Sequence, residues 1–417
     1  ADRPLSPSSP APSTVAEPPV SGPAATEAQA PGAPPSEADA AAAQALGTTT
    51  ADFALTLYRQ LDPDSGNRVL SPASISLALA MTASGARQGT RAEMLSALRV
   101  TDVPDVDASA QALLAKLGED STLHIANRLF GERTFEFRPD YMQRVARSYG
   151  APLETLDFRT GAEAARVHIN DWVSERTQSR INDLLPPRSI GSDSRLVLVN
   201  AVHFLGRWAT PFDPARTSQA PFHRASGGDV SVPTMTRSGR ERYGADEAVQ
   251  VVELPYADGD LAMVIVVPRD VDGLPAVERS LDMTHYVAWT ALLQPNVLVN
   301  LSLPRFEIAP PDTLALRSSL ERLGMRQAFA RGQADFLGIA DPASAADRLY
   351  VSEVFHKAFV RVDEAGTEAA AATAVVMARS GGRPQVATVT ADRPFLFFIR
   401  DTATGAVLFM GRVADPS

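Results

Sequence analysis

A run of small side chains near the carboxyl end constrains this chain more than any other segment. Residues 364–376 read EAGTEAAAATAVV, and the turn-forming stretch MARSGGRPQ follows at residues 377–385. In an extended strand, successive side chains point to opposite faces. One face would carry Thr367, Ala369, Ala371 and Thr373, and the other Glu368, Ala370 and Ala372. Because the first face holds neither a charge nor a proline, this segment could enter a β-sheet between two strands.

A helix is the alternative structure for the same run, because alanine is the strongest helix former. Gly366 lies directly before the alanines, and the β-branched residues Thr373, Val375 and Val376 follow them. Glycine and β-branched side chains both disfavour a helix. These residues weaken the helical alternative without removing it.

Several separated sequence blocks, in a fixed order, resemble the serpin family. After the loop, the segment VTADRPFLFFI at residues 389–399 fits the family's C-terminal signature, and the small-residue run resembles the hinge of its reactive-centre loop. The other blocks are NRVLSPASISLALAMTASGARQG at 67–89, VNAVHFLGRW at 199–208, VPTM at 232–235, LPRF at 303–306 and VSEVFHKAFVRV at 351–362. The resemblance covers nearly all of residues 50–414.

Apolar periodicity predicts helices first and strands afterwards, which is typical of an α+β fold. Phe53, Leu57, Tyr58 and Leu61 would share one helical face, and Ser71 would cap a helix that starts at Pro72. Apolar or alternating runs predict strands at 196–204, 251–254, 261–267, 297–303 and 395–399. The resemblance implies a helix-rich N-terminal part packed on a large central β-sheet, further sheets, and an exposed reactive-centre loop.

Residues 1–48 differ in composition from the rest of the chain. They hold ten of the 32 prolines and no aromatic residue, so they cannot bury enough apolar surface to offset the entropy of ordering. We predict a disordered tail or tether at 1–48 and one serpin domain at 49–417. The alanine-rich run at 40–45 is the one part of this tail that could begin a helix.

Composition and motif content exclude several function classes. A net charge of -10 gives no electrostatic support for nucleic-acid binding, and no apolar run is long enough to cross a membrane. Without cysteine, the chain has no disulfide, thiol nucleophile or zinc–thiolate site. No hydrolase, metalloprotease or phosphate-loop motif is present. The sequence therefore predicts a protein that is not an enzyme and needs no cofactor or metal.

The resemblance assigns roles to two groups of residues around the sheet that opens during loop insertion. Ser71, Ser74, Asn200 and His356 match the family's shutter, the polar cluster beneath the sheet. Trp208, Arg305 and Glu364 match the breach, where insertion begins, and Arg305 and Glu364 could form an ion pair. The alternative readings are a buried core histidine for His356, a helix cap for Ser71 and core filling for Trp208.

The resemblance implies an inhibitor that a serine protease cleaves and that then holds the protease as a covalent acyl-enzyme. The commonest family spacing from Glu364 places Ser380 before the cut, but a long cation suits the acidic pocket of trypsin-like enzymes. We therefore predict cleavage at Arg379-Ser380. Cleavage after Met377 or Ser380 is the alternative, and it would suit a subtilisin-, chymotrypsin-, elastase- or papain-like protease. A non-inhibitory serpin that acts as a binding or chaperone-like protein is the alternative function.

Partners and location are predicted only in outline. AAAATAVV is similar to antithrombin-type loops, but Lys116 is the only basic residue before His124 in the segment 103–124. The sequence therefore argues against activation by heparin-type polyanions. We expect a monomer that is secreted or lies in the cell envelope of a prokaryotic host, where its tail could tether it.

Overall fold

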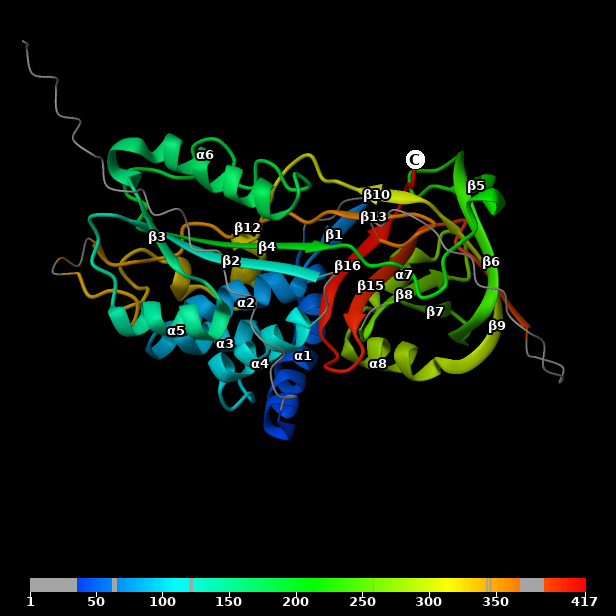
Figure 1. Ribbon diagram of the computed structural model, residues 1–417, viewed down its shortest axis with the longest axis horizontal. Coiled ribbons are helices and arrows are strands. Elements are labelled where there is room, and N and C mark those ends of the chain that lie inside the picture. The colour runs from blue at the N-terminus through cyan, green and yellow to red at the C-terminus, as the bar shows by residue number, and fades with distance from the viewer. Residues whose placement is uncertain are drawn as a thin grey trace, which may run out of the picture. The chain divides into compact units, whose positions relative to one another are not determined.

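Nine α-helices and 16 β-strands make up the part of the chain that the computed structural model describes (Figure 1). That part comprises residues 36–61, 66–119, 123–257, 259–342, 344, 347–367 and 386–417, with only the backbone described at residues 124–126, 200, 201 and 203. Residues 37–417 form one unit. Helices predominate in its first part and strands in its second, so the predicted α+β class is confirmed.

The first helix, α1 (Glu37–Tyr58), begins well before the predicted start of the domain at Thr49. Ala43 and Leu46 are buried in the main core, as are the predicted face residues Phe53 and Leu57. The alanines at 40–43 extend the helix toward the N-terminus, because an alanine side chain loses no conformational entropy when the backbone becomes helical. The boundary predicted at residue 48 is therefore placed too late for this helix.

Eight further α-helices follow in the described residues. They are α2 (Pro72–Ala83), α3 (Gln88–Ala97), α4 (Val106–Gly118), α5 (Pro139–Tyr149), α6 (Phe158–Arg176), α7 (Leu274–Arg279), α8 (Met283–Leu292) and α9 (Arg317–Arg322). Ser71 is the N-cap residue of α2 and Pro72 its first residue, as predicted. The Ser71 side chain makes no capping hydrogen bond, so the predicted capping role of its hydroxyl is wrong.

The largest sheet has nine strands in the order β1-β16-β15-β8-β7-β6-β9-β14, with β5 paired to β6. Its strands are β1 (Arg68–Leu70), β5 (Ser218–His223), β6 (Asp229–Ala245), β7 (Val249–Pro255), β8 (Leu261–Pro268), β9 (Gln294–Pro304), β14 (Val386–Thr390), β15 (Phe395–Asp401) and β16 (Val407–Val413). The run FLFFI lies in β15, which pairs with β16 on one side and β8 on the other. All five of its side chains are buried, on both faces of the strand, which explains why its sequence does not alternate.

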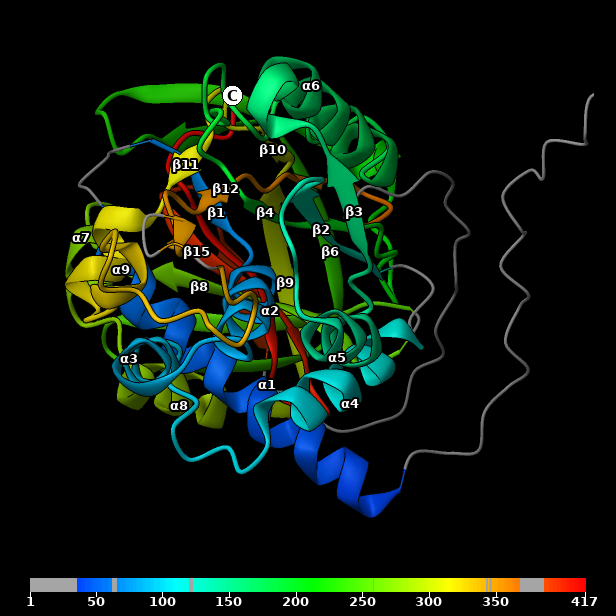
Figure 2. The ribbon, with the colours of Figure 1, turned by 90° about the vertical axis from the view of Figure 1, so that its left-hand side faces the viewer.

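A three-stranded sheet of β3 (Leu153–Leu156), β2 (Leu123–Glu132) and β4 (Leu196–Phe204) lies between α6 and the helices α2 to α5 (Figures 1 and 2). Side chains alternate across it. Leu129 belongs to the main core, whereas Phe130 packs with Ile169 and Trp172 in a second core beneath α6. This sheet therefore separates two apolar layers.

Two short strand pairs complete the described architecture. They are β10 (Phe306–Ile308) with β13 (Val360–Val362), and β11 (Leu314–Ala315) with β12 (Phe355–His356). Among the described residues, β4 and β13 belong to different sheets. Isolated bridges join Arg207, just after β4, to Gly366, and Val362 to Thr367. The interval between β4 and β13 is therefore closed at this end by the start of the small-residue run.

Candidate functional site

The start of the small-residue run, Glu364 to Thr367, is anchored between two strand ends, and we call it the hinge root. The backbone N–H of Trp208 donates to the Ala365 carbonyl at 2.9 Å, and that of Thr367 donates to the Gly206 carbonyl at 2.7 Å. Thr367 is only 2% exposed and also bridges to Val362 at the end of β13. The chain therefore passes into the loop from a position between the two strands.

Gly366 is required by the close approach of two backbones. A Cβ atom at this position would lie 2.0 Å from the Gly206 carbonyl oxygen and 2.7 Å from the Arg207 Cα. Both contacts involve backbone atoms, which cannot move aside as a flexible side chain can. The glycine that argued against a helix in the sequence is thus the residue that lets the hinge root reach the strand beside it.

Arg305 and Glu364 form the predicted ion pair. The Arg305 Nη2 lies 2.6 Å from the Glu364 Oε1, and the Arg305 Nε donates to both carboxylate oxygens at 2.8 Å. The Thr217 hydroxyl also donates to this carboxylate. Burial alone would raise the pKa of Glu364, but the hydrogen bonds from Arg305 and Thr217 outweigh burial and hold the pKa below its ordinary value.

Glu364→Gln should therefore destabilise the fold at neutral pH. Because Arg305 is 45% exposed, we discount the pair for solvent screening and expect a loss of about 1–2 kcal/mol in the free energy of unfolding. The lowered pKa of the Glu364 carboxyl means that its stabilising contribution is present above pH 4.5 and is lost as pH falls through its folded-state pKa. Urea denaturation at pH 7 and pH 3 measures both effects. Glu307→Gln, at an exposed position of the neighbouring strand β10, is the matched control; an equal loss in both variants would contradict the prediction.

Trp208 holds the hinge root from the side of β4. Its indole stacks on Tyr256, with ring centroids 4.7 Å apart and an interplanar angle of 12°, and its Nε1–H donates to the Asp363 carbonyl at 3.0 Å. The Tyr256 and Thr367 hydroxyls are 2.7 Å apart. Trp208 is therefore more than core filling, because its N–H binds the residue before the hinge root and its ring supports Tyr256, which contacts Thr367.

Tyr256 and Thr217 were missed by sequence reasoning. Tyr256 begins the stretch YADGD, which reads as a turn, and Thr217 follows the short 3-10 helix Pro214–Arg216. Tyr256 contacts Thr367, and Thr217 contacts Glu364. More than a hundred positions of sequence separate the two residues of each pair. The only signal in the sequence was the presence of an aromatic residue in an otherwise polar turn.

His356 and Ser71 are in contact, as the shutter resemblance implied. The backbone N–H of Ser71 donates to the His356 Nε2 at 3.0 Å, so Nε2 is unprotonated. Burial lowers the pKa of His356 to about 4. Ser74 is buried nearby in α2, and the Ser71 hydroxyl has no hydrogen-bond partner among the described residues. The side chain of Asn200 lies outside the described residues, so its predicted place in this cluster stays a prediction.

Acidification should weaken the fold through His356. The folded-state pKa of about 4 lies below the ordinary value of 6.5, so the unfolded chain binds more protons between these two values. The stabilising contribution of the neutral ring is complete above pH 6.5 and is lost as pH falls toward 4, by up to about 3 kcal/mol. Unfolding free energies measured across this window should fall more steeply for the unmodified protein than for His356→Gln. His285→Gln, which removes an exposed histidine of α8, should retain the steep dependence; a His356→Gln variant with the same slope would refute the assignment.

A cavity of about 420 Å³ adjoins Ser74 and His356, two residues of the predicted shutter. It lies between α2, the connection at 184–191, the first residues of β4 and the segment 349–356, and Ser74 and His356 are among its lining residues. Figure 2 shows β12 and β4 in this region above α2. We call this space the shutter cavity.

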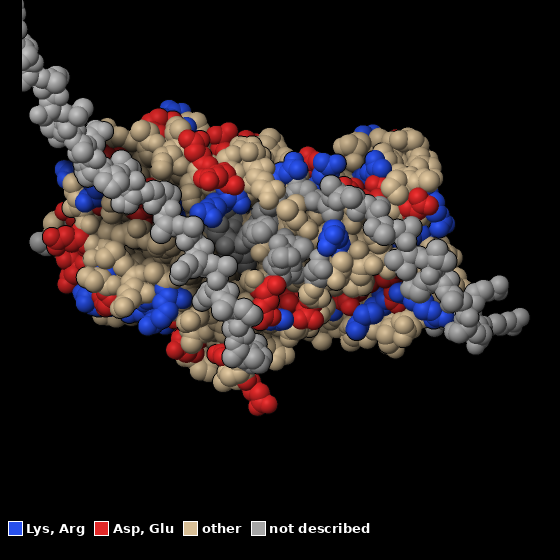
Figure 3. Space-filling model, viewed as in Figure 1, with Lys and Arg blue, Asp and Glu red and all other residues tan. Residues whose placement is uncertain are grey.

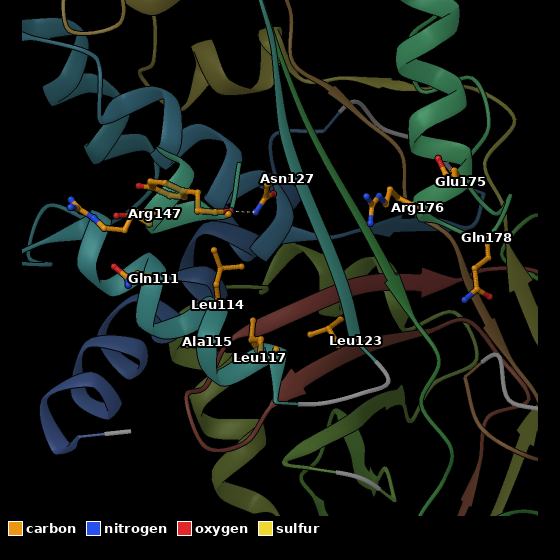
Figure 4. Close-up of a pocket in the computed structure, with 14 residues that line it drawn as sticks. Gln111, Leu114, Ala115, Leu117, Leu123, Asn127, Arg147, Glu175, Arg176 and Gln178 are labelled. Carbon is orange, nitrogen blue, oxygen red and sulfur yellow. Dashed lines mark hydrogen bonds between the residues drawn. The ribbon is translucent and has the colours of Figure 1, made fainter. Parts of the chain in front are cut away.

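A second hollow, of about 720 Å³, lies between α4, α5, the start of β2 and the end of α6 (Figure 4). Asn127 donates to the Tyr149 carbonyl at 2.8 Å in its wall. Gln111 and Arg147 lie at one end of this hollow, and Arg176 and Gln178 lie at the other. Its polar side chains are spread out, whereas those of the hinge root converge on one carboxylate.

Lys116, the basic residue of the segment 103–124, is engaged by two carboxylates. Its Nζ lies 3.1 Å from Glu119 and 3.1 Å from Asp260, and hydrogen bonding to Asp260 raises the pKa of Lys116. On the face drawn in Figure 3, the coloured cationic and acidic groups are interspersed. The expected lack of activation by heparin-type polyanions stays a prediction.

The predicted reactive bond and most of the predicted hinge lie outside the described residues. They are Glu368, Ala369, Ala370, Ala371, Ala372 and Thr373 of the hinge, and Met377, Arg379 and Ser380 of the loop. The chain resumes at Val386 in β14, which pairs in parallel with β9 at the edge of the nine-stranded sheet. The two ends of the loop are thus held in different parts of the fold.

Within the described residues, no helix is both long and apolar enough to span a membrane.

Comparison with known proteins identifies the family. The model of the family described as "Serpin (serine protease inhibitor)" matches residues 48–416. The chain is 38% identical over 383 residues to leukocyte elastase inhibitor of Xenopus tropicalis, covering 89% of this chain and 99% of that protein. It is 37% identical over 384 residues to antithrombin-III of Homo sapiens, covering 89% of this chain and 82% of that protein. These two relatives come from animals and lend no support to the predicted prokaryotic host.

Solved structures show the same fold. A cleaved serpin, Serpin 42Da, superposes with a TM-score of 0.80 and 30% identity, covering 90% of this chain and 100% of that one. The thermophilic serpin Tengpin in its native state gives a TM-score of 0.77 and 30% identity, covering 88% and 93% of the two chains. The predicted serpin fold is confirmed, and this chain belongs to the serpin family.

Proposed function

We propose that this serpin is a suicide-type inhibitor of serine endopeptidases. The observation that carries the proposal is the position of Thr367, which is buried between Gly206 and Val362 at one end of the interval between β4 and β13. A strand that continued inward from Thr367 would extend between these two strands. The hinge root therefore lies where an inserted strand would begin.

The proposed reaction starts when the protease serine attacks the carbonyl carbon of residue 379. The bond between residues 379 and 380 breaks, the amine of residue 380 takes up a proton, and an ester joins the serine oxygen to residue 379. The two loop ends are held in different parts of the fold, so cleavage frees the hinge side from β14. About 13 residues at about 3.3 Å each then carry the protease about 40 Å, and the displaced active site no longer hydrolyses the ester.

Trypsin-like enzymes are the proposed targets, because Arg379 offers a long cation to an acidic pocket. The similarity to leukocyte elastase inhibitor favours a second candidate, in which an elastase-like protease cleaves after Met377 or Ser380. The non-inhibitory alternative would require a bulky or charged residue on the inserted face, and Thr367 is neither bulky nor charged.

Mixing the purified protein with trypsin, elastase and subtilisin in turn tests the proposal. A band that survives denaturation at the summed mass, with a released peptide that starts at Ser380, is the expected result for trypsin. A complex whose peptide starts elsewhere would move the specificity to another bond. Cleavage without a complex for every enzyme would overturn the inhibitor assignment and leave the binding or chaperone-like function as the better proposal.

We also infer that the protein acts as a monomer outside the cell or in its envelope, without a polyanion activator. The pairing of Lys116 with Glu119 and Asp260 supports the last point. The proline-rich sequence before Glu37 suits a tether. Sedimentation of the free protein measures the oligomeric state, and the inhibition assay with and without heparin measures the polyanion response.

A further inference from the structure

The shutter cavity has the size of a small-molecule site and a lining that is partly apolar and partly charged. Its volume of about 420 Å³ lies within the range of ligand pockets. Its lining includes the apolar side chains of Leu79, Leu185, Ile190, Leu198, Phe336 and Val351. Separate chain segments contribute these side chains, so the cavity is a feature of the assembled fold rather than of one loop.

The lining also includes charged side chains, with one more arginine than carboxylates. These are Arg188, Arg195, Arg331 and Arg348, and Asp193, Asp347 and Glu353. Asp347 pairs with Arg195 at 3.3 Å, and the Glu353 carboxylate accepts hydrogen bonds from the backbone N–H groups of Arg317 and Val354 at 2.9 Å. Two of the three carboxylates are therefore already engaged.

Three of the four arginines remain available to a ligand. Arg188, Arg331 and Arg348 are exposed, and none forms an ion pair with another described residue. Arg331 lies over the ring of Tyr350, 6.0 Å from its centroid, and Tyr350 is itself part of the lining. The lining carries one net positive charge, and in a chain of net charge -10 three guanidinium groups that are unpaired among the described residues, beside apolar side chains, favour an anionic head group.

We propose that the shutter cavity binds a long-chain alkyl carboxylate, with the chain among the apolar residues and the carboxylate at the exposed arginines. Guanidinium groups bind carboxylates through two parallel hydrogen bonds. Each methylene removed from the chain should weaken binding about fourfold, because it leaves apolar surface of the cavity uncovered. A neutral head group would leave the arginines without an anionic partner.

Occupation of this cavity competes with loop insertion. Ser74 and His356 belong to its lining, and it separates the start of β4 from the segment 349–356. An inserted strand that continued from Thr367 would have to cross the same interval. A bound amphiphile therefore delays insertion and lets the acyl-enzyme hydrolyse, and this second part rests on the proposed function.

Calorimetric titration of the full chain with dodecanoate, below its micelle concentration, tests the binding site. We expect one saturable site, about 16-fold weaker binding of decanoate, and much weaker binding of dodecanol. The double substitution Arg331→Gln with Arg348→Gln should weaken dodecanoate binding about tenfold or more. Arg147→Gln with Arg176→Gln removes the same charge from the hollow of Figure 4 and should leave the affinity unchanged.

Three results would overturn the site. They are the absence of saturable binding, equal affinity for dodecanol, and loss of affinity in the Arg147 and Arg176 control instead of the Arg331 and Arg348 variant. Because circular dichroism of each variant shows whether it folds, a misfolded double variant would be replaced by Arg331→Gln and Arg348→Gln singly. None of these measurements requires a protease.

The competition is tested separately with a trapped protease. Saturating dodecanoate should raise the number of inhibitor molecules consumed per protease several-fold, and the loop-cleaved protein should lose dodecanoate binding. Unchanged consumption in the presence of bound dodecanoate would refute the competition but leave the binding site standing. If no protease forms a complex even without dodecanoate, the proposed function fails and the titration alone decides the site.

Discussion

Thr367→Arg should convert the protein from an inhibitor into a substrate of its target protease. Thr367 is almost fully buried, its N–H donates to the Gly206 carbonyl, and its hydroxyl lies 2.7 Å from that of Tyr256. An arginine here would bring a cation with no carboxylate partner against the stacked rings of Trp208 and Tyr256. The hinge root of this variant should avoid that contact by staying outside the sheet, so insertion would have to bury the unpaired charge at a cost of several kcal/mol. Each 1.4 kcal/mol added in this way to the insertion barrier slows insertion about tenfold.

Insertion competes with hydrolysis of the acyl-enzyme, so the slowed step decides the outcome. We expect the yield of denaturant-stable complex to fall at least about tenfold, while the loop is cleaved at an unchanged rate. Gel analysis of complex against cleaved protein, at several ratios of inhibitor to protease, measures this partition. Thr367→Ser keeps the hydroxyl and the small volume and should still form the complex. If Thr367→Arg traps protease as efficiently as Thr367→Ser, burial of this residue does not limit loop insertion.

Much of the fold was predictable because local sequence and tertiary environment agree. The strands predicted at 196–204, 261–267 and 395–399 correspond to β4, β8 and β15. Each is an apolar run bounded by turn residues, and β8 and β15 each lie between two neighbouring strands. The pairing of Arg305 with Glu364 was also predicted, but from the family resemblance rather than from spacing.

The remaining features depend on contacts that sequence periodicity does not encode. The helical start of α1 at Glu37 is stabilised by burial of Ala43 and Leu46 against distant parts of the core. The sequence predicts that the Ser71 hydroxyl caps a helix. In the structure it is the backbone N–H of Ser71 that makes a hydrogen bond, and it donates to His356, 285 positions further along the chain. Tyr256 contacts Thr367 at a place where Gly366 lets two backbones approach and where a Cβ on Gly206 would lie 2.6 Å from the Tyr256 ring. The positions of the site residues therefore depend more on contacts between distant parts of the chain than on local secondary-structure propensity.

Arg379→Leu should abolish trapping of trypsin-like proteases and redirect the inhibitor to enzymes with apolar pockets. The acidic group of a trypsin-like pocket would face leucine and remain buried without a partner. A loss of about 3–5 kcal/mol in transition-state binding corresponds to a fall of at least about a hundredfold in the rate constant for inhibition. Measured association rates with trypsin and chymotrypsin should therefore change in opposite directions. The hinge root is untouched by this change, so the trapping step itself should remain intact.

Arg383→Leu is the matched control, because it removes the other arginine of the same loop. Pro384 follows Arg383, and a proline after the scissile residue disfavours attack by removing the N–H group and fixing the backbone. This variant should inhibit trypsin as fast as the unmodified protein. If it instead loses inhibition while Arg379→Leu retains it, cleavage occurs at Arg383 and the inserted strand is four residues longer than proposed. If both variants still trap trypsin, Arg379 alone does not direct the protease. Continued trapping by the variant that carries both substitutions would then make specificity through Met377 or Ser380 the better proposal.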